Sequence, residues 1–227
     1  MSPTLGYRGV VVTRIAGILL AAGDGTRLGQ PKATVVLNGA TLAERGVALL
    51  RAGGADPVLV VTGAVDVSVP GTLAVPNEAW ASGMGSSLVA GLRALTAGGP
   101  DGTADRPGGG RGGAPGVGAA VIALADQPLI GPEAVRRLIA AHAAGASVAV
   151  AAYDGKPRNP VLIARGHWPE VITMASGDAG ARPFLRAHPD LVTLVECDDT
   201  GSPDDIDTPE ELARVRALTP PAPPTGR

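Results

Sequence analysis

Apolar runs of strand length alternate along the chain with longer segments in which hydrophobic residues recur at helical spacing. The runs are almost wholly apolar, which is typical of strands that are buried on both faces of a parallel sheet. They are "IAGILLA" at 15–21, "PVLVVTG" at 57–63, "GTLAVP" at 71–76, "AAVIALA" at 119–125 and "ASVAVAAY" at 146–153. The pattern predicts that these runs are strands of one central sheet.

Helical segments are predicted between the runs. The first, "TLAERGVALLRAGG", begins with Thr41 and Glu44 at the spacing of a capping box. "GMGSSLVAGLRAL" and "PEAVRRLIAAHAAG" follow, the latter with Pro132 in its first turn. A last helix is predicted after Thr208, which has capping-box spacing to Glu211. This alternation of strands and helices predicts an α/β fold with a doubly wound, mostly parallel sheet in three layers.

Length and composition indicate one ordinary domain. The chain has 227 residues, of which 45% are hydrophobic, enough for one sizeable core. We expect a single domain at 15–218 after an N-terminal extension at 1–14. The stretch at about 98–116 is rich in Gly and Pro and predicts a flexible insertion, and the Pro-rich end at 219–227 predicts a disordered tail.

Charge and aromatic content argue against several classes of partner. The chain has 19 basic and 21 acidic residues and a net charge of -2. It therefore lacks the surplus of positive charge that binding to duplex nucleic acid or an anionic membrane requires. Aromatic residues make up 2%, so stacking on single strands is not expected. No apolar run approaches the ~20 residues of a membrane span. The single Cys197 fits a reducing compartment, so we expect a cytoplasmic protein.

A glycine-rich loop with two cationic residues follows the first predicted strand. Ligands of open α/β sheets bind beyond the carboxyl ends of the strands, and glycines let backbone amides approach phosphate oxygens. Arg27 and Lys32 can neutralise an anion there. The stretch "GDGTRLGQPK" matches neither the dinucleotide fingerprint nor a Walker loop, because Leu28 holds the third glycine position and Lys32 follows Pro31. It predicts a phosphate-binding loop of another type.

Acidic residues in two places are candidate metal ligands. Asp126 follows the run at 119–125, and Asp205 and Asp207 precede the last helix, whose capping residues do not account for them. Magnesium in phosphoryl-transfer sites takes one or two carboxylates together with substrate phosphates. We therefore expect Asp126 and Asp207 to bind Mg²⁺.

Several stretches also occur in an order that is found in a known family. They are "LAAGDGTRLGQPK", "PNEAWASGMGSSLVAGL", "LADQPLI", "RNPVLI", "SGDAGARPFL" and "DIDTPEEL". The series resembles the molybdenum cofactor cytidylyltransferase family, within the broader group of enzymes that make molybdopterin dinucleotides. The resemblance runs from about Ile15 to Leu218. It implies a Rossmann-like nucleotidyltransferase fold whose first loop wraps the triphosphate of an NTP.

The resemblance also implies roles for the matching residues. The catalytic residues would be Arg27, Lys32, Asp126 and Asp207, with Asp126 and Asp207 also binding Mg²⁺. The nucleotide would lie against Leu20, Ala21, Ala22, Gly23, Gly25, Arg27, Lys32, Asn77, Gly83, Met84 and Ser87. The acceptor would lie against Asn159, Asp178 and Arg182.

The implied reaction moves CMP from CTP to the phosphate of molybdopterin and releases pyrophosphate, and a molybdoenzyme or its chaperone would be a further partner. An acceptor phosphate is already ionised near neutral pH, so the transfer needs cations and oriented amides more than a base. We accordingly expect His142, His167 and His188 to be surface or packing residues. Trp80 is expected either beside the nucleotide or as an anchor of its loop.

Two other functions remain open. The same fold could transfer a nucleotide to another phosphorylated acceptor, such as a sugar phosphate. The chain could also be a non-catalytic carrier of the molybdenum cofactor, although the intact cationic and acidic positions argue against this. The family often has His-Pro-Val where this chain has Asn159, Pro160 and Val161, and this departure falls on the acceptor side of the predicted site.

Overall fold

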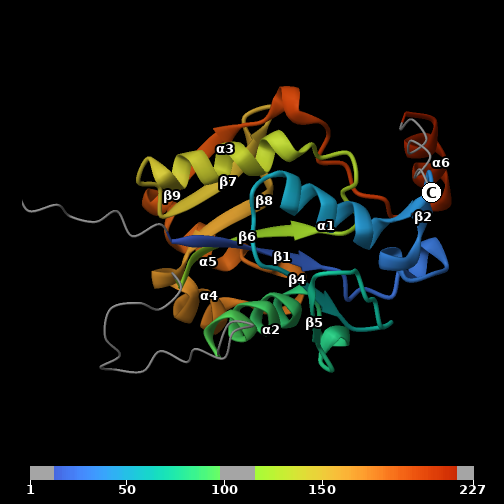
Figure 1. Ribbon diagram of the computed structural model, residues 1–227, viewed down its shortest axis with the longest axis horizontal. Coiled ribbons are helices and arrows are strands. Elements are labelled where there is room, and N and C mark those ends of the chain that lie inside the picture. The colour runs from blue at the N-terminus through green and yellow to red at the C-terminus, as the bar shows by residue number, and fades with distance from the viewer. Residues whose placement is uncertain (1–12, 98–115, 219–227) are drawn as a thin grey trace, which may run out of the picture.

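The computed structural model describes residues 13–97 and 116–218. The predicted insertion, the predicted tail and nearly all of the predicted N-terminal extension lie outside the described residues. At the centre is a seven-stranded sheet, and helices lie on both of its faces (Figure 1). The expected α/β fold with a mostly parallel, three-layer arrangement is confirmed.

The strands of the large sheet lie in the order β5-β4-β1-β6-β8-β7-β9. Their bounds are β1 Arg14–Leu20, β4 Val58–Thr62, β5 Leu73–Pro76, β6 Val117–Leu124, β7 Val148–Tyr153, β8 Lys156–Ala164 and β9 Val192–Glu196. Each predicted strand is present, whereas β8 and β9 were not predicted. A separate two-stranded sheet is formed by β2 Val36–Leu37 and β3 Ala40–Thr41.

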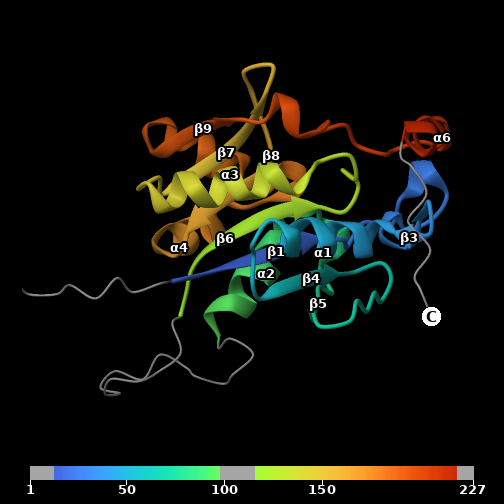
Figure 2. The same ribbon diagram turned by 45° about the horizontal axis from the view of Figure 1, so that its top comes forward.

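Strand β8 is the exception to the parallel arrangement. It pairs antiparallel with both β6 and β7, and the other neighbours in the large sheet are parallel. The β7–β8 hairpin extends beyond the rest of the sheet in Figure 2. Because β8 runs in the opposite direction, its first residues lie at the edge where the parallel strands end. This direction brings the segment 156–159 to the edge at which ligands bind.

The helices cover the sheet on two sides. Helices α1 (Leu42–Ala52) and α3 (Pro132–Ala143) lie on one face, and α2 (Met84–Thr96), α4 (Trp168–Met174) and α5 (Arg182–Ala187) lie on the other (Figure 1). Helix α6 (Pro209–Leu218) lies apart from both, beside the small sheet (Figure 2). Both predicted capping boxes are formed, Thr41 with Glu44 and Thr208 with Glu211.

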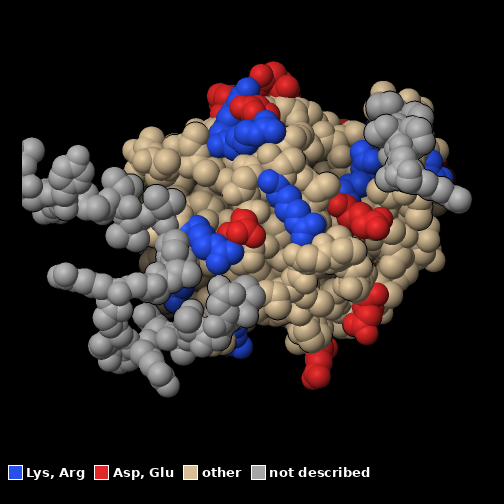
Figure 3. Space-filling view, in the orientation of Figure 1, with Lys and Arg blue, Asp and Glu red and all other residues tan. Residues whose placement is uncertain are grey.

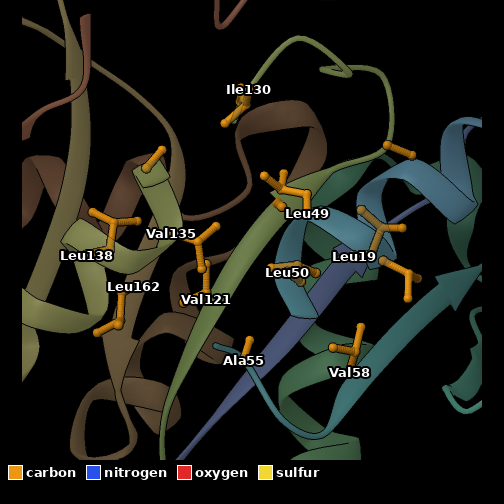
Figure 4. Close-up of a cluster of buried hydrophobic side chains, with 14 of the residues drawn as sticks. Leu19, Leu49, Leu50, Ala55, Val58, Val121, Ile130, Val135, Leu138 and Leu162 are labelled. Carbon is orange, nitrogen blue, oxygen red and sulfur yellow. The ribbon is translucent and has the colours of Figure 1, made fainter. Parts of the chain in front are cut away.

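Each face of the sheet has its own hydrophobic core. The core under α1 and α3 consists mainly of Ala, Val and Leu side chains, some of which are drawn in Figure 4. The core on the other face contains the two largest fully buried side chains, Trp168 and Phe184. A third, smaller core joins Leu28 of the glycine loop to Ile206 and to two residues of α6, Leu212 and Val215. It fixes the glycine loop relative to the acidic segment that precedes α6.

In the two described ranges, no helix has both the length and the hydropathy that crossing a bilayer requires. On the face shown in Figure 3, the described residues present acidic and basic side chains interspersed on a mostly uncharged surface.

We predict that Gly85→Ala destabilises the protein. A Cβ at Gly85 would lie 2.7 Å from the backbone nitrogen of Ser176, and a backbone contact cannot be relieved by rotating a side chain. Alanine is the better helix former by about 1 kcal/mol, but overpacking costs about 1–3 kcal/mol. Urea unfolding should show a net loss of stability.

Gly166→Ala is the matched control, because no heavy atom of the described residues other than its own and its chain neighbours' lies within 4 Å of its Cβ position. We expect a change within about 0.5 kcal/mol for that variant. If both variants were equally stable, the contact between α2 and Ser176 would not constrain the fold.

Candidate functional site

A cleft of about 1760 Å³ opens at the carboxyl edge of the sheet. Small-molecule sites usually measure about 300–1,000 Å³, so this cleft has room for two substrates. Most of the site residues that the sequence predicts line this cleft. They are Leu20, Ala21, Ala22, Gly23, Gly25, Arg27, Lys32, Gly83, Met84, Ser87, Asp126, Asn159, Asp178, Arg182 and Asp207. The fold thus brings the motifs that are predicted to bind the nucleotide, the metal and the acceptor to one concavity.

The glycine loop is shaped by local contacts. Gly25 has a φ of 64°, and a Cβ there would collide with the carbonyl oxygen of Gln30, so only glycine fits. A turn of 3-10 helix follows over Thr26–Leu28. The carboxylate of Asp24 accepts hydrogen bonds from the Thr26 hydroxyl (2.7 Å) and backbone amide (3.2 Å). These bonds, the hydroxyl first, lower the pKa of Asp24 and keep it ionised as a structural part of the loop.

The ammonium group of Lys32 lies between two carboxylates. Nζ donates a hydrogen bond of 2.7 Å to Asp126 Oδ2 and another to Asp207 Oδ1. Arg27, which is largely exposed, donates to the other oxygen of Asp207 at 2.8 Å. Burial alone would lower the pKa of Lys32, but the carboxylates of Asp126 and Asp207 outweigh burial and raise it. The hydrogen bond from Lys32 is in turn the largest cause of the lowered pKa of Asp207.

Backbone and amide contacts hold the two acidic segments together. The backbone amide of the fully buried Ile206 donates to the Asp126 carbonyl at 2.8 Å. The Gln127 side chain donates to the Pro203 carbonyl (2.9 Å) and to Asp205 Oδ1 (2.8 Å). Burial, and then the charge of Asp126, raise the pKa of Asp205. The other amide atom of Gln127, Oε1, is buried and has no hydrogen-bond partner among the described residues.

Asn77 is a predicted nucleotide contact that does not line the cleft. Its side chain is 7% exposed and donates to the hydroxyls of Ser86 (2.8 Å) and Ser87 (3.0 Å), while its Oδ1 accepts from the Ala79 amide. Asn77 therefore orients the first turn of α2 without itself lining the cleft. Trp80 does line the cleft, beside that turn.

The motif "SGDAGARPFL", which holds the predicted acceptor contacts Asp178 and Arg182, touches the start of α2. A Cβ at Gly83 or Gly85 would clash with the backbone at 176–177, so these glycines permit close packing of the two segments. Arg182 donates to the Asp178 carbonyl at 3.4 Å. The cleft is also lined on this side by residues that were not predicted, namely Lys156, Arg158, Arg186 and Leu194. In the sequence, the spacing of Arg182 and Arg186 by one helical turn was the signal that both side chains could lie on the same side of a site.

The histidines lie outside the lining of the cleft, as predicted, and so does the cysteine. His142 bonds the Ala146 carbonyl, and His167 and His188 pack against the ring of Phe184. Cys197 is fully buried, and burial raises the pKa of its thiol, so it remains protonated near neutral pH.

We predict that Lys32→Met raises the pKa of Asp207. The variant removes the main cause of the lowered pKa and leaves two carboxylates facing each other, which disfavours ionisation. In the wild-type protein this interaction stabilises the fold above the ordinary carboxyl pKa of about 3.9 and is lost as the pH falls through the lower native value. Side-chain ¹³C NMR during a pH titration measures the change directly.

Arg136→Met is the matched control, since it removes an ion pair with Glu133 on the exposed surface of α3. It should leave the titration of Asp207 unchanged. An unaltered Asp207 pKa in the Lys32 variant would contradict the bridging role of the lysine.

Comparison with known proteins agrees with this geometry. The family model described as "MobA-like NTP transferase domain" matches residues 17–192. Nicotine blue oxidoreductase of Paenarthrobacter nicotinovorans is 37% identical over 216 residues, covering 88% of this chain and 96% of that protein. A "Probable molybdenum cofactor guanylyltransferase" of Opitutus terrae is 40% identical over 86 residues, 37% of this chain and 43% of that one. The crystal structure of the Rv0371c homologue from Mycobacterium sp. strain JC1 has a TM-score of 0.71 and 26% identity, covering 90% of this chain and 96% of that chain. The chain therefore belongs to the MobA-like NTP transferase family and is a nucleotidyltransferase.

Proposed function

We propose that this nucleotidyltransferase moves CMP from CTP to the phosphate of a molybdopterin-type acceptor, with Mg²⁺ as cofactor and pyrophosphate as the second product. The observation that carries the proposal is the position of Lys32 between Asp126 and Asp207, directly beside the glycine loop. This is the arrangement of cations, carboxylates and amides that phosphoryl transfer requires.

The residues at this end of the cleft fit a divalent metal. One oxygen of Asp126 and one of Asp207 contact the same ammonium group, so they are close enough to contact a single metal ion. Gln127 also lines the cleft, and its buried Oε1 has no hydrogen-bond partner among the described residues. Carboxylate and amide oxygens suit Mg²⁺. Within 13–97 and 116–218, no group of three or more His, Cys, Asp or Glu residues is arranged to hold a metal alone. Phosphate oxygens of the nucleotide would therefore complete the coordination.

The charge of the cleft also favours a metal. The end beside β1 and β6 is lined by two cationic side chains, Arg27 and Lys32, and by the carboxylates of Asp24, Asp126, Asp204, Asp205 and Asp207. A triphosphate is strongly anionic and would be repelled by this surplus of carboxylates. A divalent cation would offset the repulsion when it is bound.

The chain's own residues would act mainly by positioning charge. Lys32 and Arg27 would exchange their carboxylate partners for oxygens of the triphosphate, and the amides of the glycine loop would contact the same group. A bond then forms between an acceptor phosphate oxygen and the α-phosphorus, the bond from that phosphorus to the bridging oxygen breaks, and pyrophosphate leaves. Donors fixed before the reaction stabilise the charge that develops on these oxygens.

The choice of CTP rests on the start of α2. The motif at 77–88 resembles the cytidylyl-transferring branch, and Gly83, Met84 and Ser87 line the cleft there. Backbone groups at 83–86 could pair with the exocyclic amine and carbonyl of cytosine. A site built for these groups would leave buried polar atoms unpaired with another base, and such mismatches discriminate strongly.

The name of one relative points to different chemistry. Nicotine blue oxidoreductase is named for a redox reaction. The loop of this chain lacks the dinucleotide fingerprint, because Leu28 stands at its third glycine position. The pair of carboxylates beside two cations favours nucleotide transfer for this chain.

We predict that CTP is preferred over GTP, ATP and UTP by at least about tenfold in kcat/KM, or roughly 1.4 kcal/mol of transition-state binding. The experiment measures pyrophosphate release from each NTP with Mg²⁺ and molybdopterin. Reactions without acceptor, or with a sugar phosphate in its place, are the controls.

Equal use of CTP and GTP, or a preference for GTP, would contradict the proposed base. Turnover with the sugar phosphate alone would contradict the proposed acceptor. Oxidation of NADH without pyrophosphate release from any NTP would contradict the proposed reaction.

We further predict that Lys32→Met tightens divalent metal binding in the absence of nucleotide by about tenfold, because the ammonium occupies the point where the two carboxylates meet. Binding of Mn²⁺, as a spectroscopic substitute for Mg²⁺, is measured by electron paramagnetic resonance. The same variant should bind CTP more weakly, since it loses a phosphate contact.

Asp126→Asn removes a proposed metal ligand and should abolish Mn²⁺ binding with or without Lys32. Unchanged or weaker Mn²⁺ binding by Lys32→Met would show that the lysine and the metal do not share a position.

A further inference from the structure

A strip of apolar side chains crosses β8, β7 and β9 in the wall of the cleft. Val150 of β7 is in register with Val161 of the neighbouring β8 and with Leu194 of the neighbouring β9. Partners in register share one face of a sheet, so the three side chains form a row. All three line the cleft. We call Val150, Val161 and Leu194 the apolar strip.

The strip is only partly covered by the fold. The preceding row, Val148, Ile163 and Val192, packs in the core with α4 and α5. In the strip itself, Val150 and Val161 are buried, but Leu194 is 47% exposed. A single exposed leucine is unremarkable in general, but this one continues a buried row into the wall of a cleft. The strip therefore offers an apolar floor to a ligand.

Cationic side chains surround this floor. Lys156 and Arg158 come from the start of β8, and Arg182 and Arg186 lie one turn apart on α5. All four line the cleft and are exposed. Other arginines of the described chain, such as Arg136, form ion pairs with carboxylates.

No carboxylate of the described residues forms an ion pair with any of these four cations. The acidic residues of the lining at this end are Asp154 and Asp178. The end of the cleft at the apolar strip, which we call the outer end, thus carries a surplus of positive charge. The end at Asp126 and Asp207, which we call the catalytic end, carries a surplus of carboxylates. Such a surplus attracts an anionic ligand, and guanidinium groups bind its oxygens in pairs.

We propose that the outer end binds the acceptor as a flat ring system, which lies on the apolar strip with an anionic substituent held by Arg158 and Arg186. This rests on the proposed function in taking the ligand to be the acceptor of the nucleotidyl group. The ring buries its apolar faces against Leu194, and the arginines compensate the charge. One cleft connects the strip to Lys32, so the reacting phosphate of the same molecule can reach the catalytic end.

A second copy of the chain is a less suitable occupant. Edge strands such as β9 can pair between molecules. Two copies meeting symmetrically at this surface would place Arg158 and Arg186 of one beside the same cations of the other. A small anionic ligand neutralises these charges instead.

The test uses pterin-6-carboxylate, a fluorescent flat heteroaromatic acid, as the probe. It is titrated into the whole protein without nucleotide or metal. We expect Leu194→Glu to weaken binding by about tenfold or more, because it removes apolar contact and repels the anion. Arg158→Met and Arg186→Met should each weaken binding by about threefold and reduce its dependence on salt.

Matched controls come from outside the cleft. Leu73→Glu changes a leucine of similar exposure (38%) on β5, the opposite edge strand. Arg93→Met removes an exposed arginine from the last turn of α2. Neither residue lines the cleft, and both variants should bind the probe as the wild-type protein does.

The outcomes separate this inference from the proposed function. If the probe binds and depends on Leu194, the inference holds, even where no nucleotide is transferred to molybdopterin. Absence of probe binding, or unchanged affinity of Leu194→Glu, overturns the inference even where transfer proceeds. Loss of a dimer in Leu194→Glu during sedimentation, with unchanged probe affinity, assigns the strip to a second copy and also overturns it.

Discussion

The carboxylates of Asp126 and Asp207 face each other at the edge of the sheet, and ionised groups at this distance repel unless a cation lies between them. Lys32 supplies that cation. The interaction requires the loop after β1, the end of β6 and the segment before α6 to meet at one point. Two features hold these segments together. They are the small core of Leu28, Ile206 and α6, and the hydrogen bonds that the Gln127 side chain donates.

Much of this arrangement could be predicted, because it depends on local signals. Strands buried on both faces appear as unbroken apolar runs, and the capping boxes at Thr41 and Thr208 are set by residues three positions apart. The approach of Asp126 to the glycine loop follows from the rule that parallel strands end at one edge. The acidic segment before α6 was assigned to the same edge because the helix cap does not account for Asp205 and Asp207, and the resemblance to a family supported this assignment.

The remaining features depend on contacts that no local pattern contains. Strand β8 begins with "KPRNP", and its polar residues and prolines conceal a strand that is apolar only in its second half. Without its antiparallel direction, Arg158 could not be placed at the edge where ligands bind. Asn77 has the same side chain whether it faces a ligand or holds two serines, and only packing decides between them. Strand β9 is short and half-exposed, so it lacks the apolar run of a buried strand.

The small core at α6 has a consequence for motion on the timescale of local unfolding. Only Leu212 and Val215 of this helix are buried, and Leu218 at its end is 67% exposed. Detaching such a helix exposes little apolar surface, so its opening requires less free energy than global unfolding. Asp207 lies two residues before α6, and its carboxylate would leave Lys32 and Arg27 whenever the helix detached. The amides of α6 should therefore exchange with solvent sooner than those of the central strands, and the integrity of the catalytic end depends on this weakly packed helix rather than on the most stable part of the sheet.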